Sequence, residues 1–331
     1  MRPFTFAAPS SVDEALAHTE AAYLAGGTTL VDLMKLDVMT PGRVVDINRL
    51  PLRGIRVDRH GLRIGALERM SDVAADPRVR AEYPMVAEAL LGASPQLRNM
   101  ATIGGNLLQR TRCGYFRDTA VPCNKRAPGT GCPARDGENR SHAVLGTSDS
   151  CVATHASDLA VALVALGATL SLRGRDGGRT VPLADLYRLP GDTPHLETEL
   201  RPGELISAVS VPRSALSRRS TYVKLRDRRS YGFALTSAAV AVHLVGDLVH
   251  DARVAVGGVG TVPWRLPAVA DALRHRPMRL DVFEAAARRA AEGVRPLAHN
   301  RFKVALMQRT IIRALLDLAG HDGLDRAGHD G

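Results

Sequence analysis

The sequence predicts an α+β protein that begins with small α/β units and ends with an antiparallel sheet packed against helices. Short strand-like and helix-like stretches are mixed as far as Leu91. Strand patterns joined by a turn signal occupy residues 221–256, and three helix-like stretches follow, the last ending near Leu318. The length of 331 residues suits two or three domains.

The first predicted domain covers residues 1–52. A capping-box pattern, with Ser11 as the N-cap and Glu14 three residues later, predicts a short helix. Strands are predicted over 22–25 and 43–47, with a helix over 30–36 between them. A turn-like stretch at 48–51 ends this small unit.

The second predicted domain covers residues 53–215. Its sequence predicts a hairpin of strands over 54–57 and 61–66, then helices over 70–76 and 85–91. Beyond a cysteine-bearing stretch, the predicted elements are a buried helix over 159–166, a strand over 168–172, a turn over 174–178 and a strand over 205–211. The polar residues 213–220 predict a linker.

The third predicted domain covers residues 216–320. Strands are predicted over 221–225, 237–244 and 248–256, with Val245-Gly246-Asp247 as a hairpin turn. Helices are predicted near 266–274, 281–292 and 301–318. Residues 319–331 contain Gly-His-Asp-Gly twice, and we expect a disordered tail that covers residues 321–331.

The composition predicts a soluble globular protein with an anionic cofactor or an acidic partner. The net charge is +10, but the arginines are scattered and aromatic residues make up only 4%, so we expect no nucleic-acid binding. No apolar run reaches the roughly 18 residues of a membrane span, so we expect no membrane insertion. The N-terminus lacks an apolar signal core. We therefore expect a cytoplasmic protein, or a periplasmic one if a signal-bearing partner exports it.

Two glycine turns suit a ligand. Gly26-Gly27-Thr28-Thr29 follows a predicted strand and precedes a predicted helix, where a pyrophosphate can approach the backbone and meet free N–H groups. The spacing matches neither the Rossmann nor the P-loop motif, so a bare tight turn is the alternative. Thr102-Ile103-Gly104-Gly105-Asn106 is a second turn of the same character, with a β-bulge or hairpin corner as its alternative.

All four cysteines, Cys113, Cys123, Cys132 and Cys151, fall within 39 consecutive positions. No Cys-x-x-Cys pair occurs, which argues against a zinc ribbon or a thioredoxin-type motif. Long loops between single thiolates suit a [4Fe–4S] cluster, while structural zinc, disulfides and free thiols stay open.

The segment of residues 109–150, which carries three of the cysteines and directly precedes Cys151, has seven basic and four acidic residues, and its net charge of +3 would offset a thiolate cluster. Little of it is apolar, so we expect it to need a metal in order to fold. We interpret Tyr115, Phe116 and His142 as packing or supporting groups rather than ligands.

No arrangement of nucleophile and base, and no His-x-x-x-His spacing, stands out among the eleven histidines. We expect no catalytic residue in this chain, because the difficult chemistry would belong to cofactors.

The chain resembles the FAD-binding medium subunits of the molybdenum hydroxylases, the family of the xanthine and carbon monoxide dehydrogenases. The resemblance runs from Phe4 to Leu318. The motifs that carry it are Tyr23–Leu30, Ala101–Asn106, Ser157–Ala160 and Pro202–Ile206. The cysteine-bearing insertion is most similar to the FAD and iron–sulfur subunit found in periplasmic aldehyde oxidoreductases, particularly from Arg98 to Arg126.

The resemblance implies a fold with two FAD-binding subdomains of the vanillyl-alcohol-oxidase (PCMH-like) type, residues 1–52 and 53–215. The second subdomain carries the iron–sulfur insertion at 109–150, and residues 216–320 resemble the C-terminal domain of the carbon monoxide dehydrogenase flavoproteins. It implies two cofactors, FAD and a [4Fe–4S] cluster held by the four cysteines. The implied FAD contacts are Leu24, Ala25, Gly26, Gly27, Thr28, Thr29, Leu30, Val31, Ala101, Thr102, Gly104, Gly105, Asn106, Asp158, Ile206 and Lys224. The alternative interpretation of Asp158 is that it caps the helix that follows, and the alternative interpretation of Lys224 is that it lies on the solvated surface.

The resemblance also implies a role in a complex. A molybdenum-cofactor large subunit would oxidise an aldehyde- or xanthine-type substrate, and a [2Fe–2S] small subunit would pass electrons to this chain, in a heterotrimer or a dimer of it. FAD would deliver them to a terminal acceptor, whose identity the sequence leaves open. A zinc-stabilised basic scaffold protein and a stand-alone flavin oxidase are the alternative functions.

Overall fold

The N-terminal part of the chain forms a small parallel sheet. The computed structural model describes residues 1–228 and 230–327. In the order β1-β3-β2, the parallel strands are Thr5–Ala7, Arg43–Asp46 and Ala22–Leu24. Helices α1 (Val12–Leu16) and α2 (Leu30–Lys35) join them. Ser11 caps α1 as predicted, since its hydroxyl accepts from the Glu14 N–H at 3.2 Å.

A five-stranded antiparallel sheet follows, in the order β4-β5-β8-β6-β7. Its strands are Ile55–Asp58, Gly61–Gly65, Leu205–Pro212, Thr169–Gly174 and Gly177–Pro182. Its inner face packs on helices α3 (Met70–Ala75), α4 (Pro77–Glu82), α5 (Pro84–Leu91) and α9 (Asp158–Ala165). Residues alternate along β5, with Leu62 and Ile64 buried and Arg63 exposed, so the outer face of this sheet is polar.

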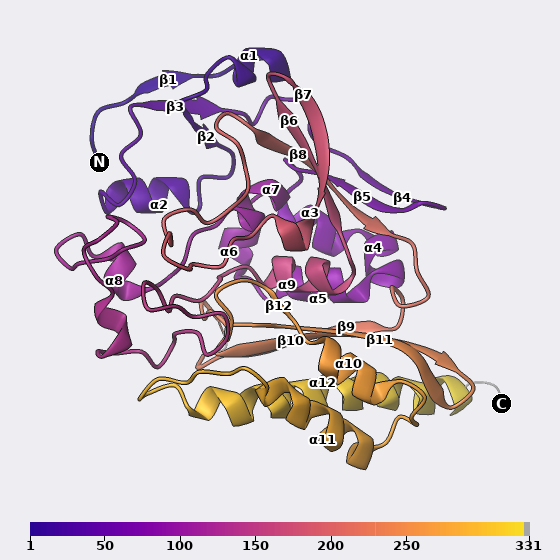
Figure 1. The fold of residues 1–331 in the computed structure, drawn as a ribbon. Helices are drawn as coiled ribbons and strands as arrows, with labels where there is room; N and C mark the ends of the chain where they lie inside the picture. The colour runs from indigo at the N-terminus through magenta and orange to yellow at the C-terminus, as the bar shows by residue number, and fades with distance from the viewer. Residues whose placement is uncertain (229, 328–331) are drawn as a thin grey trace.

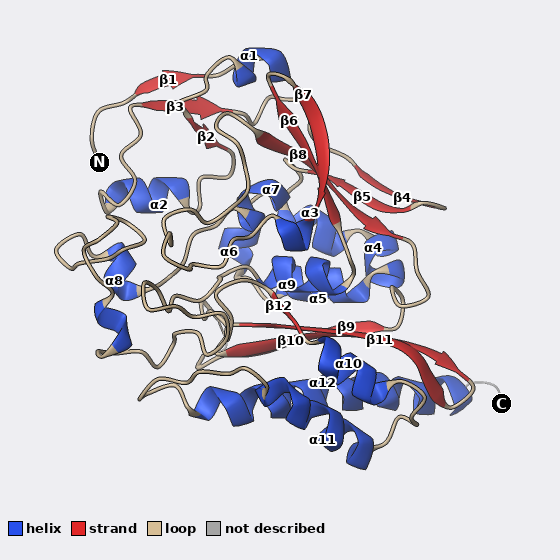
Figure 2. Ribbon diagram, in the orientation of Figure 1, coloured by secondary structure: helices blue, strands red, loops and turns tan. Residues whose placement is uncertain are grey.

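The C-terminal part is a four-stranded antiparallel sheet, in the order β12-β11-β10-β9, with helices on both faces (Figure 1). Its strands are Trp264–Arg265, Leu248–Gly257, Thr236–Val245 and Ser220–Leu225. Helices α5 and α9 pack on one face, and α10 (Pro267–Leu273), α11 (Leu280–Arg288) and α12 (Phe302–Ala327) on the other. The layers therefore run sheet, helices, sheet, helices (Figure 2).

The small side chains of β10 explain how a chain poor in aromatics builds this stack. Ala239 and Ala241 belong to the core around α5 and α9, while Val240 and Val242 belong to the core around α10 to α12. Because the strand is buried on both faces, its sequence is a continuous apolar run. The predicted α+β class is confirmed. Among the described residues, no helix has the length and apolarity that a membrane crossing demands.

Three predicted details are wrong. Residues 177–182 form strand β7, where a turn was predicted over 174–178, because the tight turn lies at 175–176. The second glycine turn is the start of helix α7 (Ile103–Leu107) rather than a bulge or hairpin corner. Helix α12 continues to Ala327 instead of ending at residue 318, because a helix once nucleated adds residues at little cost. The disordered tail predicted over 321–331 stays a prediction, and its residues 328–331 lie outside the described part of the chain.

Helix α6 (Pro95–Arg98) lies before the cysteine-bearing segment, and the segment itself has little regular structure beyond α8 (Gly114–Arg117) and a 3-10 helix over Pro133–Arg135. Its backbone is held by side chains instead. The Arg126 guanidinium donates to the carbonyls of Tyr115 and Phe116 at 2.9 and 2.7 Å, and to that of Val121. Such hydrogen bonds replace the ladders of a helix or sheet.

The far end of the segment is anchored on α12. Lys303 is fully buried, and its ammonium donates to the carbonyls of Ser141, His142 and Gly258 at 2.9, 3.0 and 2.7 Å. The Asn300 amide also donates to the carbonyls of His142 and Ala143. Residues at and just before the C-terminal helix therefore hold the end of the segment in place by hydrogen bonds to its carbonyls. The predicted domain limits at residues 52, 215 and 320 stay a prediction.

Candidate functional site

The first glycine turn lines a cavity of about 380 Å³ between the parallel sheet and the five-stranded sheet. The N–H groups of residues 26–30 have no hydrogen-bond acceptor within the described chain, which leaves them free for an anion. A Cβ atom on Gly26 would lie 2.0 Å from the Met100 carbonyl oxygen. The missing side chain therefore lets the first turn lie directly against the second.

The second turn lines the same cavity and an adjoining one of about 410 Å³. The Thr102 hydroxyl caps α7 by accepting from the Gly105 N–H at 3.3 Å. Four residues, Thr28, Thr29, Ala101 and Gly105, line both cavities. The two cavities thus make one elongated site of the size that an extended dinucleotide needs.

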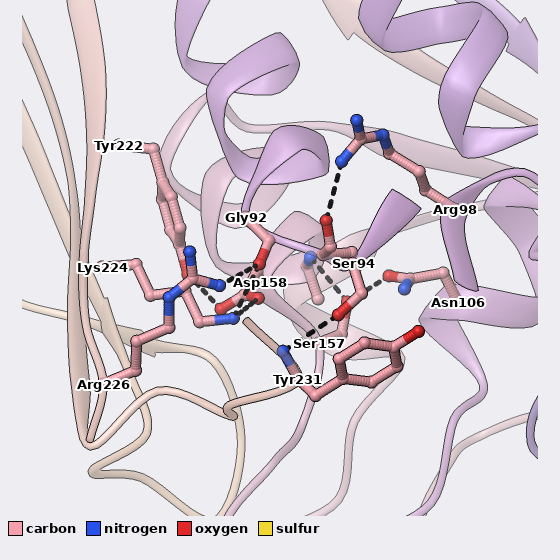
Figure 3. A network of polar contacts seen from close by, with 12 residues as sticks. Gly92, Ser94, Arg98, Asn106, Ser157, Asp158, Tyr222, Lys224, Arg226 and Tyr231 are labelled. Atoms are coloured by element: carbon pink, nitrogen blue, oxygen red, sulfur yellow. Dashed lines mark hydrogen bonds and ion pairs between the residues drawn. The ribbon is translucent and has the colours of Figure 1, made fainter. Parts of the chain in front are cut away.

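A polar network closes the far end of the second cavity (Figure 3). The Asp158 carboxylate accepts from the Lys224 ammonium at 2.7 Å and from the Tyr222 hydroxyl at 2.6 Å. Lys224 also donates to the Gly92 carbonyl at 3.2 Å. Burial, and then the Asp158 charge, raise the pKa of Tyr222, so its hydroxyl stays a donor. The network joins α9, β9 and the end of α5 around the cavity.

The alternative roles of Asp158 and Lys224 are wrong. Ser157 is the N-cap of α9, since its hydroxyl accepts from the Ala160 N–H at 3.0 Å, and Asp158 is the first helical residue. This frees the Asp158 carboxylate for Lys224. The Lys224 side chain is only 8% exposed, so it is not a solvated surface group.

The structure brings the predicted FAD contacts together. All of them except Leu24 and Val31 line one of the two cavities. Leu24 and Val31 lie beside Gly27, where their side chains would contact an added Cβ at 3.3 and 3.2 Å. The individual contacts with FAD stay a prediction.

Two aromatic residues at this site were missed. Tyr231 and Phe233 line the second cavity and are 49% and 44% exposed. The Arg112 guanidinium lies 5.1 Å from the centre of the Phe233 ring. In a chain with so few aromatics, two exposed ones around a glycine could have indicated a ligand-facing loop.

Arginines of the cysteine-bearing segment also reach the FAD cavities. Arg110 lines the first cavity, and Arg112 and Arg117 line the second. Both Arg112 and Arg117 donate to the Asp32 carboxylate on α2 at 2.8 Å. The hydrogen bond from Arg117 is the main cause of the lowered pKa of Asp32. These ion pairs hold the segment against the cofactor site.

The four cysteines converge on one small cavity, which Phe116 and Ala134 also line. All four are free thiols, so the disulfide alternative is wrong. Burial raises the pKa of Cys113 to about 11 and also raises the pKa values of Cys132 and Cys151. No group of three or more His, Cys, Asp or Glu side chains in the described ranges is arranged to hold a single metal ion.

A third, narrow cavity of about 50 Å³ lies between the cysteines and the FAD cavities. Leu107 and Leu108, which follow the second turn, line it together with Cys151. His155 and Tyr187 also line it, with their rings edge to face at 4.5 Å. Burial lowers the pKa of His155 to about 4, so the His155 ring is neutral at pH 7.

Comparison with known proteins identifies the family. Residues 2–214 match the FAD binding domain in molybdopterin dehydrogenase, and residues 221–318 match the CO dehydrogenase flavoprotein C-terminal domain. The chain belongs to the FAD-binding medium subunits of the molybdenum hydroxylases. It is a subunit of a molybdenum-dependent oxidoreductase whose molybdenum site lies on another chain, and the scaffold and stand-alone oxidase alternatives are not favoured.

Whole-chain relatives agree with this assignment of the medium subunit. The aldehyde oxidoreductase FAD-binding subunit PaoB of Escherichia coli is 47% identical, with 96% of this chain and 98% of that one covered. The carbon monoxide dehydrogenase medium chain of Hydrogenophaga pseudoflava is 30% identical, with coverages of 94% and 96%. A solved carbon monoxide dehydrogenase structure from the same organism superposes with a TM-score of 0.72 at 28% identity, over 95% of this chain and 96% of that one.

Removing the Asp158 carboxylate is expected to destabilise the medium subunit. Asp158→Ala would leave the buried Lys224 ammonium without its counter-charge, which costs about 3 kcal/mol of unfolding free energy. Urea unfolding followed by circular dichroism measures the loss. The double variant Asp158→Ala/Lys224→Met should recover most of it, because no unpaired charge remains. Equal stability of the single variant and the unchanged protein would contradict this role.

Proposed function

We propose that this chain is the electron-transfer subunit of an aldehyde-oxidising molybdenum enzyme, and that its four cysteines hold a [4Fe–4S] cluster beside FAD. The partners in this proposal are a molybdenum-cofactor large subunit and a [2Fe–2S] small subunit. The similarity to aldehyde oxidoreductase PaoB, at 47% identity, supports an aldehyde over a xanthine substrate.

The observation that carries the cluster proposal is the convergence of four distant cysteines on one cavity. In a cubane the four thiolates bind four different irons, so they stand further apart than thiolates around a single ion. Four cysteines that line one cavity agree with that arrangement.

The residues of this chain fit both cofactors. Bound here, FAD would supply two-electron and the cluster one-electron chemistry. The free N–H groups of residues 26–30 would hold the pyrophosphate, and the pair of Asp158 and Lys224 would orient the other end of FAD. Phe116 and Ala134 would keep water from the cluster, because both are buried at its cavity. Cys151 lines both the cysteine cavity and the narrow cavity, and Leu108 lines both the narrow cavity and the first FAD cavity, so electrons would pass through the protein around this narrow cavity.

Anaerobic purification of the complex tests this proposal. We expect FAD absorbance from this chain, and iron in about a four-to-one ratio to FAD once the iron of the small subunit is subtracted. Aldehydes should bleach both cofactors while xanthine does not. Zinc in place of iron would overturn the cluster proposal alone, and bleaching by xanthine alone would overturn the aldehyde proposal.

His142 is expected to raise the reduction potential of the cluster. Its Nε2 lies 3.1 Å from the Cys113 sulfur, and its Nδ1 is buried with no hydrogen-bond partner in the described chain. Burial lowers the pKa of His142 to about 4, so the neutral ring has one N–H, which we place on Nε2 because only that nitrogen has a neighbour. An N–H donated to a ligating sulfur stabilises the reduced cluster.

The His142→Ala variant should therefore keep its iron but show a more negative midpoint potential in a redox titration followed by electron paramagnetic resonance. His142→Gln retains a hydrogen-bond donor, so its midpoint potential should lie between those of His142→Ala and the unchanged protein. An unchanged potential in a fully loaded His142→Ala protein would contradict this role.

A further inference from the structure

The outer face of the five-stranded sheet forms a groove of about 720 Å³ that none of the described functions uses. It lies between that face, the segment 51–54 and Val12 at the start of α1, and it shares no lining residue with the FAD cavities or the cysteine cavity. Helices α3, α4, α5 and α9 pack on the opposite face of the sheet (Figure 1). The groove is therefore a separate feature of the subunit.

A row of small residues crosses the floor of the groove. Gly65, Ala208, Ser171 and Thr180 lie side by side across strands β5, β8, β6 and β7. Their small side chains leave room above the sheet, which the arginine side chains of the lining border. At Gly65 an added Cβ would lie 2.4 Å from the Leu52 carbonyl oxygen, which shows how closely the segment 51–54 borders the floor. A bordered floor of small residues accommodates an extended chain.

Five arginines and no carboxylate line the groove; they are Arg53, Arg56, Arg63, Arg173 and Arg179. Two of these arginines form ion pairs with carboxylates that do not line the groove. Arg56 pairs with Asp58 at 2.6 Å, and Arg179 pairs with Glu204 at 2.7 Å.

The other three arginines have no carboxylate within 4.0 Å in the described chain. Arg53 donates to the Leu67 carbonyl at 2.8 Å, and Arg63 reaches the Ser171 hydroxyl only at 3.5 Å. Arg63 also stands directly opposite Arg56 in the β4–β5 pair, an arrangement of like charges that destabilises a sheet. The isolated subunit thus carries an uncompensated positive charge on this face.

We propose that this groove binds an extended acidic segment of a partner subunit. Guanidinium groups bind carboxylates with paired hydrogen bonds, and the open rim lets a chain pass along the strands. A small free anion would need a closed pocket to be held, whereas this groove is open to solvent along the sheet face. The inference rests on the proposed function only in taking this chain to be one subunit of a complex.

The test is a double charge reversal, Arg63→Glu/Arg173→Glu, compared with Arg288→Glu/Arg309→Glu. The control pair lies exposed on α11 and α12, far from the groove in the chain fold, and changes the net charge by the same amount. We expect the groove variant to bind the partner subunits about ten-fold more weakly at low salt and to show a flatter dependence on NaCl concentration. The control should bind like the unchanged subunit.

Equal weakening in both variants would mean that only overall charge matters, and no weakening would mean that the groove is not an interface; either overturns the proposal. Titration with tripolyphosphate adds a third arm. If it binds the unchanged subunit but not the groove variant while assembly is the same, the groove takes a free anion and the proposal also fails. FAD content, measured on the same samples, reports separately on the proposed function.

Discussion

The Gly26→Ala variant is expected to be produced without FAD. The added methyl would lie 2.0 Å from the Met100 carbonyl oxygen, 2.7 Å from its carbon and 2.9 Å from the Ala101 Cα. All three are backbone atoms, so no rotamer change can relieve the contact, and the two cofactor-binding turns must move apart. Overpacking of this kind costs about 1–3 kcal/mol, and if that cost falls on the bound form, FAD binds roughly 10- to 100-fold more weakly.

The ratio of flavin to protein absorbance, followed by FAD titration of the apoprotein, measures the loss. Gly42→Ala is the matched control, since an added Cβ there has nothing within 4 Å. It should keep a full complement of FAD. Full flavin content in Gly26→Ala would show that the two turns do not act together in binding.

The Cys123→Ser variant is expected to lose nearly all the iron of this chain while keeping FAD. Cys123 is 8% exposed at the shared cavity, so its loss leaves a buried cluster with three thiolates where four are needed. The segment from 113 to 151 should then become sensitive to protease, because little apolar packing holds it. Iron analysis and limited proteolysis give the two readings.

Glu138→Gln provides a control in the same segment, because the Glu138 side chain is 86% exposed. It should leave both iron and protease resistance unchanged. Retention of iron in Cys123→Ser would remove Cys123 from the ligand set, and loss of FAD along with iron would show that the two sites do not fold separately.

The sequence predicted the core of this fold because its signals are local. The strands over 22–24 and 61–65 and the helix over 30–35 follow from apolar periodicity and lie within a residue or two of their predicted limits. The N-cap of α9 was not decided by the sequence. Ser157 and Asp158 are both residue types that cap helices. Only the structure shows that Ser157 is the cap and that the Asp158 carboxylate pairs with Lys224.

The parts of the site that the sequence did not predict depend on contacts between distant residues. Lys224 looked solvated beside a run of charges, yet the layer of helices buries it against Asp158. Tyr231 and Phe233 reach the cavity only because β9 and β10 bring their loop beside the second turn. The outer-face arginines come from three separate stretches of sequence that only the strand order places together.

The anchoring of the cysteine-bearing segment on α12 makes it a poor candidate for grafting. Lys303 and Asn300 donate hydrogen bonds to four backbone carbonyls, those of residues 141, 142, 143 and 258. Both polar side chains are buried, so they need these acceptors. A chimera that received residues 109–150 without this helix would lack the segment's anchor, and one that received the helix alone would bury a lysine without acceptors. The cysteine-bearing segment and the start of the C-terminal helix, whose contacts span 158 residues of sequence, therefore depend on each other. Recombination between medium subunits should keep both from the same parent.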